Sequence, residues 1–182
     1  MYLRLKRKET IKMSTEILDQ PVVEKEKAPE PVKRVSIIIS RGTLDGVYPG
    51  LIMANGARME GIEATVFFTF FGMNAVLKDK MDKLKVATVG NPAMGMPTLL
   101  GAIPGMSAFA SKMMMKEMDK LDIPPVSEFL EMIEDSGGEV YACKAAFEMF
   151  HLKKEDLCPQ VKDIITIGDF YEKSAGAQII FT

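Results

Sequence analysis

The sequence predicts an α/β protein in which helices cover both faces of a mostly parallel sheet, giving three layers. The first observation is that its strand-like segments are nearly continuous apolar runs, such as Ile37 to Ile39, as expected for strands buried on both sides. The second is that strand-like and helix-like segments alternate along the chain, which is typical of parallel strands joined by right-handed crossovers. A functional site is therefore expected at the carboxyl ends of the strands.

The N-terminal part of the 182-residue chain differs in composition from the rest. Residues 1–32 are predicted to be a disordered charged leader, because the stretch "QPVVEKEKAPEPVKR" mixes proline with charges of both signs and lacks apolar periodicity. Residues 33–182 are expected to form a single α/β domain, which is an ordinary size for one hydrophobic core.

The first ordered elements are predicted to be a strand and a helix. The run from Val35 to Ile39 is rich in β-branched residues, which favour a buried strand. Turn-forming residues follow, and then Val47, Leu51 and Ala54 recur at helical spacing. Gly61 suits the end of that helix, because glycine readily adopts the left-handed conformation found there.

Two further strands and a long apolar loop are predicted next. "IEATVFFTFF" at 62–71 predicts the second strand, and "KLKVATVG" at 83–90 predicts the third. The uncharged stretch Val86–Ser111 is long enough to span a bilayer, but it is interrupted by Pro92, Pro97 and Pro104 and by several glycines. We therefore expect an apolar loop outside the membrane, and membrane contact is the alternative.

The C-terminal half continues the alternation. Helices are predicted at 105–121 and 126–138, where the apolar positions of the second lie on one side. The later elements are a strand at Glu139–Ala142 leading into a helix, a strand at 164–167, a helix at 169–175 and a last strand at 177–181.

Charge and cysteine content exclude several classes of protein. Residues 1–34 hold nine Lys and Arg against six Asp and Glu, so the remaining chain carries a net charge of −5 within the total of −2. An acidic folded part is a poor match to phosphate backbones, so no nucleic-acid partner is predicted. Two cysteines are too few for a secreted disulfide scaffold, and the N-terminus has no secretory signal, which predicts a cytoplasmic protein.

No cofactor or metal is predicted. The turn from Gly42 to Gly46 fits neither common phosphate-binding glycine motif. His151 is the only histidine, and if one helix joins it to Cys143 the rise of about 12 Å prevents hydrogen-bond contact within a chain. Cys143, His151 and Cys158 have spacings unlike those of common zinc sites. A surface histidine near a helix end is the simpler interpretation.

Cys143 is the main candidate for chemistry. It stands where the strand "EVYA" gives way to a helical pattern, so its sulfur is expected to face unpaired backbone N–H groups and the positive end of the helix dipole. These groups and the adjacent Lys144 favour the thiolate, which is the nucleophilic form. The alternative is a small buried cysteine that only packs.

Cys158 is a secondary candidate. It precedes Pro159, so its backbone is expected to be extended and to cap no helix. A disulfide with Cys143 would require the polar loop after His151 to run back along the helix, a distance of about 20–25 Å that seven residues just span.

Four segments together carry a resemblance to a known family. They are "VSIIISRGTLDGVYPGLIMANGARMEGIE", "ATVFFTFFGMNAV", "GNPAMGMP" and "VYACKAAFEMF", in this order over residues 33–182. In these the chain resembles the DsrE/DsrF-like family, in particular its DsrE2-type branch. The resemblance implies a DsrE-like α/β fold of flavodoxin/Rossmann-like topology, assembly into trimers or hexamers, and a role in sulfur trafficking.

The resemblance also implies a site and partners. Cys143 matches the family cysteine that accepts sulfane sulfur after a central strand, whereas Cys158 matches no family position. The implied partners are small sulfur carriers of the TusA type, rhodaneses and heterodisulfide-reductase-like complexes. A peroxiredoxin-like activity fits poorly, because the residues before Cys143 lack the peroxidatic P-x-x-x-T-x-x-C motif.

The leading hypothesis is therefore an intracellular sulfur carrier or sulfurtransferase that uses Cys143 as its nucleophile and passes sulfur to a partner thiol. One alternative is a non-catalytic assembly protein that docks a partner through the apolar loop Val86–Ser111. Another is a dithiol–disulfide redox protein that uses Cys143 and Cys158.

Overall fold

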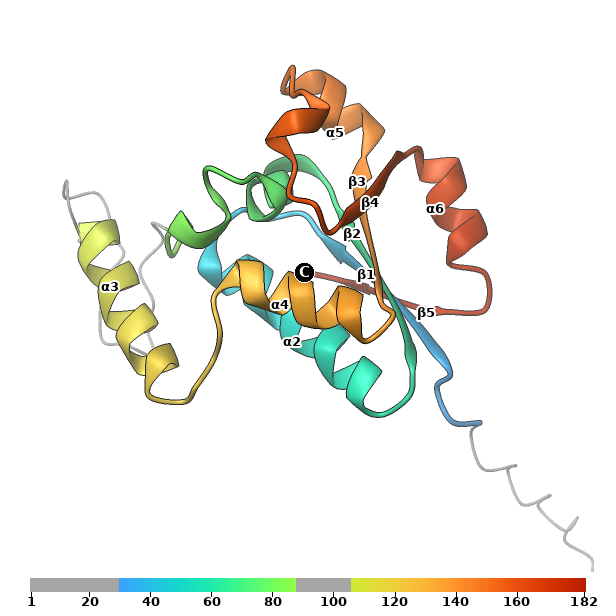
Figure 1. Cartoon of the computed structure of the whole chain (residues 1–182), viewed down its shortest axis with the longest axis horizontal. Coiled ribbons are helices and arrows are strands. Elements are labelled where there is room, and N and C mark those ends of the chain that lie inside the picture. Colours follow the sequence, from blue (N-terminus) through green and yellow to red (C-terminus); the bar gives the residue numbers. More distant parts are fainter. Residues whose placement is uncertain (1–29, 88–105) are drawn as a thin grey trace, which may run out of the picture. The chain divides into compact units, whose positions relative to one another are not determined.

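The computed structural model describes residues 30–87 and 106–182. Its strands and helices form one sheet with helices packed against it (Figure 1). The strands are β1 (Arg34–Ile39), β2 (Glu63–Phe68), β3 (Glu139–Cys143), β4 (Val161–Ile165) and β5 (Gln178–Phe181). The α-helices are α2 (Leu44–Met59), α3 (Met106–Asp119), α4 (Val126–Asp135), α5 (Lys144–Met149) and α6 (Ile167–Lys173). Short 3-10 helices are η1 (Phe70–Val76), η2 (Met81–Lys83) and η5 (Lys154–Asp156).

The five strands form one parallel sheet in the order β4-β3-β2-β1-β5. The predicted α/β fold is confirmed, because α2 and α4 lie on one face of this sheet and α6 lies on the other (Figure 1). Every strand therefore ends at the same edge, and the helix or turn that follows it begins there.

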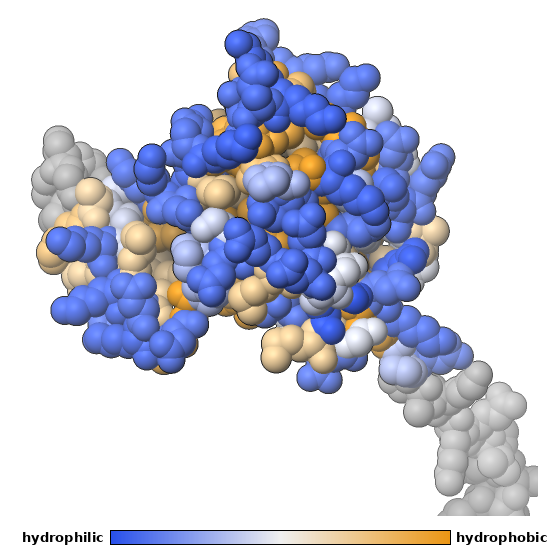
Figure 2. Space-filling model, viewed as in Figure 1, coloured by the Kyte–Doolittle hydropathy of each residue, from blue (hydrophilic) through white to orange (hydrophobic). Residues whose placement is uncertain are grey.

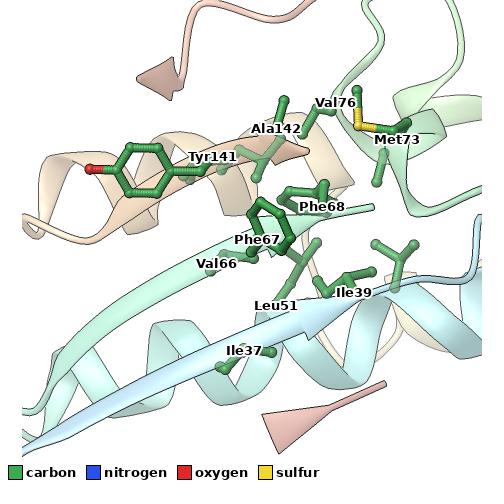
Figure 3. Close-up of a cluster of buried hydrophobic side chains, with 14 of the residues drawn as sticks. Ile37, Ile39, Leu51, Val66, Phe67, Phe68, Met73, Val76, Tyr141 and Ala142 are labelled. Atoms are coloured by element: carbon green, nitrogen blue, oxygen red, sulfur yellow. The ribbon is translucent and has the colours of Figure 1, made fainter. Parts of the chain in front are cut away.

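Alternating side chains divide the core between the two faces. Ile37 and Ile39 face α2, because a side chain at Gly50 of that helix would meet both of them. On the opposite face, Phe67 of β2 stacks on Phe170 of α6 with ring centroids 4.7 Å apart. Tyr141 of β3 is level with Phe67 and lies beneath Lys173, whose Nζ is 4.8 Å from its ring centroid. Figure 3 shows part of this buried cluster.

The second strand ends earlier than predicted. β2 stops at Phe68, and the chain turns at Phe70, whose φ of 45° is unusual for a bulky residue. The turn is bonded to the end of β1, because Thr69 N donates to Ile39 O at 3.0 Å and Gly72 N donates to Ser40 O at 2.9 Å. The aromatic run therefore suggested a longer strand than these contacts allow.

The predicted third strand at 83–90 is wrong over its described part. Residues 84–87 pair with no strand, and the preceding strand β2 is flanked by β1 and β3. Their backbone groups bond to helices instead: Lys85 O accepts from Leu44 N at 3.0 Å, and Val86 N donates to Ser111 Oγ at 3.0 Å. Residues 88–90 lie outside the described residues.

The remaining elements confirm the predictions with shifted bounds. β4 covers Val161–Ile165 instead of 164–167, because Thr166 caps α6 and accepts a hydrogen bond from Asp169 N at 3.2 Å. Most of the predicted leader, residues 1–29, lies outside the described residues, as do residues 88–105 of the apolar loop. Within 30–87 and 106–182, no helix has the length and apolar character needed to cross a membrane.

Gly72 offers a direct test of the turn after β2. A Cβ at this position would lie 2.1 Å from Ile39 O, which is backbone and cannot rotate away. We expect Gly72→Ala to lower the free energy of unfolding by about 1–3 kcal/mol through overpacking. Gly56→Ala in α2 is the control, since a Cβ there meets nothing within 4 Å and alanine favours the helix. Urea denaturation measures both, and equal stability of the two variants would contradict the tight turn.

Candidate functional site

The predicted junction between a strand and a helix at Cys143 is present in the structure. Cys143 is the last residue of β3 and the N-cap of α5, with the extended backbone conformation that N-cap residues adopt. It is level with Ile165, the last residue of β4. Cys143 therefore lies at the carboxyl edge of the sheet, at the start of α5 and next to the end of the strand that leads into α6.

The two neighbouring helices begin in different ways. At α6, Asp169 closes the first turn by accepting from both Thr166 N and Thr166 Oγ1 at 2.8 Å. These hydrogen bonds, and the cations of Lys173 and Lys144 to a smaller extent, hold the pKa of the Asp169 carboxyl below its usual value. At α5, the Cys143 side chain makes no capping hydrogen bond. The first amides of α5 therefore receive no acceptor from their N-cap side chain, and an anionic sulfur at this position would supply one.

The surroundings of Cys143 are largely apolar. The residue is 8% exposed and belongs to the buried core, whereas the adjacent Lys144 is exposed. η1 packs against both β3 and α5, and its Phe71 ring lies 5.8 Å from the Phe150 ring at the end of α5. Only a small part of Cys143 is therefore accessible within one chain.

The turn next to Cys143 was not predicted from the sequence. Phe70 and Phe71 follow the end of β2, the neighbour of β3, and they are 57% and 64% exposed. The apolar run at 62–71 predicted a buried strand that included both residues. Gly72 was the available signal, because a glycine after an aromatic run favours a turn.

Cys158 lies at a different place. It precedes β4, and its N–H donates to Val76 O at 2.8 Å, next to the antiparallel bridge between Leu77 and Leu157. Cys143 is level with the far end of β4, about 13 Å along the strand from Val161. Both cysteines are free, and the structure does not bring them together.

Burial raises the pKa of the Cys158 thiol from 9.0 to about 11, although nearby backbone hydrogen bonds oppose the rise. The residue is 2% exposed, so removal from water is the dominant cause. Cys158 is thus a neutral thiol at physiological pH and a weaker candidate for nucleophilic chemistry.

The raised pKa of Cys158 predicts a loss of stability in alkali. Between pH 9 and 11 the unfolded thiol loses its proton while the folded thiol keeps it, so the free energy of unfolding falls as the pH rises. The full loss is about 3 kcal/mol. Urea denaturation of wild type and Cys158→Ala at several pH values in this range measures the loss. The free energy of unfolding should fall less steeply with pH in the variant than in wild type. Tyr48, whose pKa burial raises to about 12, titrates in both proteins, so parallel curves would contradict the prediction.

His151 occupies the turn after α5. It is exposed and has a φ of 51°, which agrees with a surface histidine near a helix end. Among the described residues, no group of three or more His, Cys, Asp or Glu side chains is arranged to hold a metal ion.

Comparison with solved structures shows the fold. The chain resembles a conserved protein of unknown function, BT1422, from Bacteroides thetaiotaomicron, with 11% identity, a TM-score of 0.50, and 82% of this chain and 95% of that chain covered. It also resembles the YchN protein from E. coli, with 14% identity, a TM-score of 0.50, and 82% and 99% covered.

Comparison with curated sequences and family models shows the family. The chain is 33% identical to the sulfur carrier protein DsrE2 of Allochromatium vinosum over 138 residues, which cover 71% of this chain and 86% of that protein. It is 28% identical over 142 residues to the uncharacterized protein YrkE of Bacillus subtilis, with 72% and 86% covered. The model of the DsrE/DsrF/DrsH-like family matches residues 31–181, nearly the whole described part of the chain. The chain therefore belongs to the DsrE/DsrF/DrsH-like family.

Proposed function

We propose that the protein is a sulfur carrier in which Cys143 accepts sulfane sulfur and passes it to a partner thiol. The observation that carries the proposal is the position of Cys143 as the N-cap of α5, where its side chain makes no capping hydrogen bond. The similarity to the sulfur carrier DsrE2 supports the same role.

The proposed transfer has two displacement steps. The Cys143 thiolate attacks the outer sulfur of a donor persulfide, the S–S bond of the donor breaks, and the donor leaves as a thiolate. Cys143 then carries a persulfide, whose outer sulfur is attacked by the thiolate of a partner. The partner leaves with the sulfur, and the Cys143 thiolate is regenerated. No net oxidation occurs, so neither step calls for a metal or an organic cofactor.

The local charges suit both anions of this cycle. The first amides of α5 point toward the N-cap position, and the positive charge of Lys144 is adjacent to it. Because α5 has only six residues, these nearby amides contribute more than the dipole of the helix as a whole. The side of Cys143 toward α6 has an acidic residue, Asp169, whose carboxylate is already engaged by Thr166.

The remaining parts of the proposal follow from family membership. We expect a cytoplasmic homo-oligomer, a trimer or hexamer, that exchanges sulfur with TusA-type carriers, rhodaneses or heterodisulfide-reductase-like complexes. In such an assembly a partner would have to reach Cys143, a residue that is 8% exposed within one chain.

Intact-mass analysis tests the proposal. Incubation with a persulfide or polysulfide donor is expected to add the mass of sulfur to the protein, and a reducing agent should remove it, because the added sulfur is held through an S–S bond. A control sample is first alkylated at its thiols. Wild-type protein that stays unmodified with several donors would contradict a sulfur carrier.

One observation favours a second candidate, in which Cys143 only packs and the protein assembles partners without chemistry. That observation is the membership of Cys143 in the buried core. Alkylation under native conditions separates the two, because a reactive thiol labels in the folded protein and a packing thiol labels only after unfolding. The dithiol alternative is less favoured, since Cys143 and Cys158 lie toward opposite ends of β4.

A further inference from the structure

A groove lies between α3 and the segment that follows η2. Its volume is about 480 Å³, and it is lined by Lys83, Leu84 and Lys85 on one side and by α3 residues on the other. Its apolar lining residues are the buried Leu84 and the exposed Ala108 and Met115. We call it the lysine groove, after its basic lining residues Lys83, Lys85, Lys112 and Lys116.

The two walls of the lysine groove are fixed to each other by hydrogen bonds. Ser111 Oγ accepts from Val86 N at 3.0 Å and donates to Ser107 O at 2.7 Å. Ser107 Oγ donates to Val86 O at 3.4 Å. The segment that carries Lys83 and Lys85 is also bonded to the start of α2, because Lys85 O accepts a hydrogen bond from Leu44 N. The spacing of the walls is therefore set by two short serine side chains that bond to the backbone of Val86.

The lysines of the groove are available to a ligand. All four are exposed, and among the described residues none forms a salt bridge or a side-chain hydrogen bond. Lys120 of the same α3 segment differs, since its Nζ lies 2.6 Å from Glu117 Oε1. Asp119 also lines the groove, so the lining side chains carry a clear excess of positive charge. This excess stands out in a chain whose total charge is −2.

We propose that the lysine groove binds an acidic segment of a partner protein in which apolar side chains alternate with carboxylates. The carboxylates would pair with the lysines, and an apolar side chain would pack against Leu84, Ala108 and Met115. Figure 2 shows hydrophilic and hydrophobic residues side by side over α3, as this combination requires. The proposal is independent of any chemistry at Cys143.

Two other anionic partners fit this surface less well. A membrane is bound by apolar side chains that project into the lipid, whereas most of the exposed side chains that line the lysine groove are charged. A nucleic acid requires a basic stripe over an extended surface, but the chain as a whole is acidic. A peptide segment matches the mixed polar and apolar lining of the groove.

Fluorescence anisotropy with a labelled peptide tests the proposal on the full chain. The probe is a short synthetic peptide of alternating glutamate and leucine, and the reference peptide has glutamine in place of glutamate. The doubly charge-reversed variant Lys83→Glu/Lys112→Glu is expected to bind the probe at least about tenfold more weakly than wild type. The matched control is Lys33→Glu/Lys154→Glu, which makes the same change of charge at exposed lysines outside the groove. It should bind within about twofold of wild type once salt is present at physiological strength.

Several results would overturn the proposal. One is an equal loss of binding in both double variants, which would indicate attraction by net charge alone. A second is equal binding of the glutamate and glutamine peptides, which would remove the role of the lysines. A third is wild-type protein that ignores the peptide but cosediments with phosphatidylserine vesicles, since that outcome assigns the surface to a membrane. Thermal unfolding of the variants checks that their folds are intact.

Discussion

Replacement of Cys143 by serine is expected to abolish the sulfur adduct completely. Serine keeps the approximate size of the side chain and its N-cap position, and it is a good N-cap residue, so the fold should be retained. What is lost is the thiolate, which is the only group in the proposed site that can displace a thiol from a persulfide. Intact-mass analysis after incubation with a polysulfide donor should therefore show the adduct on wild type and none on Cys143→Ser.

The matched control for this result is Cys158→Ser. Cys158 is buried and its raised pKa keeps it protonated, so its replacement should leave the number of added sulfur atoms unchanged. The two variants together assign the acceptor. An adduct that persists in Cys143→Ser and disappears in Cys158→Ser would move the site to the thiol at the other end of β4. Loss of the adduct in both would instead favour chemistry that uses the two thiols together.

The fold was predictable where one pattern determined each element. The β-branched residues from Val35 to Ile39 have few alternatives to a buried strand, and the strand is found there. The helix after it was also predicted, although Pro49 lies inside α2. Pro49 is the sixth residue of α2, where proline removes one hydrogen bond of the helix, so the apolar residues that α2 buries outweigh this cost. Alternation of such elements was enough to predict a parallel sheet.

The sequence could not show where tertiary contacts override a local pattern. Leu84 and Val86 alternate with lysines as they would in a half-exposed strand, but the two edges of β2 were already filled by strands close and distant in the chain. The run Thr69 to Phe71 looked like a continuation of β2, and only its contacts with Ile39 and Ser40 turn it away. Neither outcome can be read from a single segment.

The candidate site was predicted in part for the same reason. A cysteine at the junction of a strand and the following helix lies at the carboxyl edge of a parallel sheet, so the position of Cys143 could be predicted. The low exposure of Cys143, 8%, could not be predicted, because η1 packs against β3 through contacts between residues far apart in sequence. The lysine groove was equally hidden, since Lys83 and Lys116 are distant in sequence and only the packing of α3 makes them neighbours.

The largest effect on stability is expected for Phe67→Ala. The Phe67 side chain is 1% exposed, lies in the middle strand of the sheet, and stacks on Phe170 at 4.7 Å with an interplanar angle of 28°. Its removal takes away apolar surface burial and leaves a cavity under α6, a helix of seven residues that has few other anchors. We expect the free energy of unfolding to fall by about 3–5 kcal/mol, as is typical of buried aromatic residues replaced by alanine.

Urea denaturation measures this loss, with Phe109→Ala as the control of equal chemistry. Phe109 is 58% exposed on α3, so its replacement should change the free energy of unfolding by less than about 1 kcal/mol. If Phe67→Ala lowered the free energy of unfolding as little as Phe109→Ala, α6 would have to be held by contacts other than the stack between Phe67 and Phe170. Such a result would also affect the site, because α6 begins beside Cys143, and the position of Asp169 near Lys144 depends on where that helix is anchored.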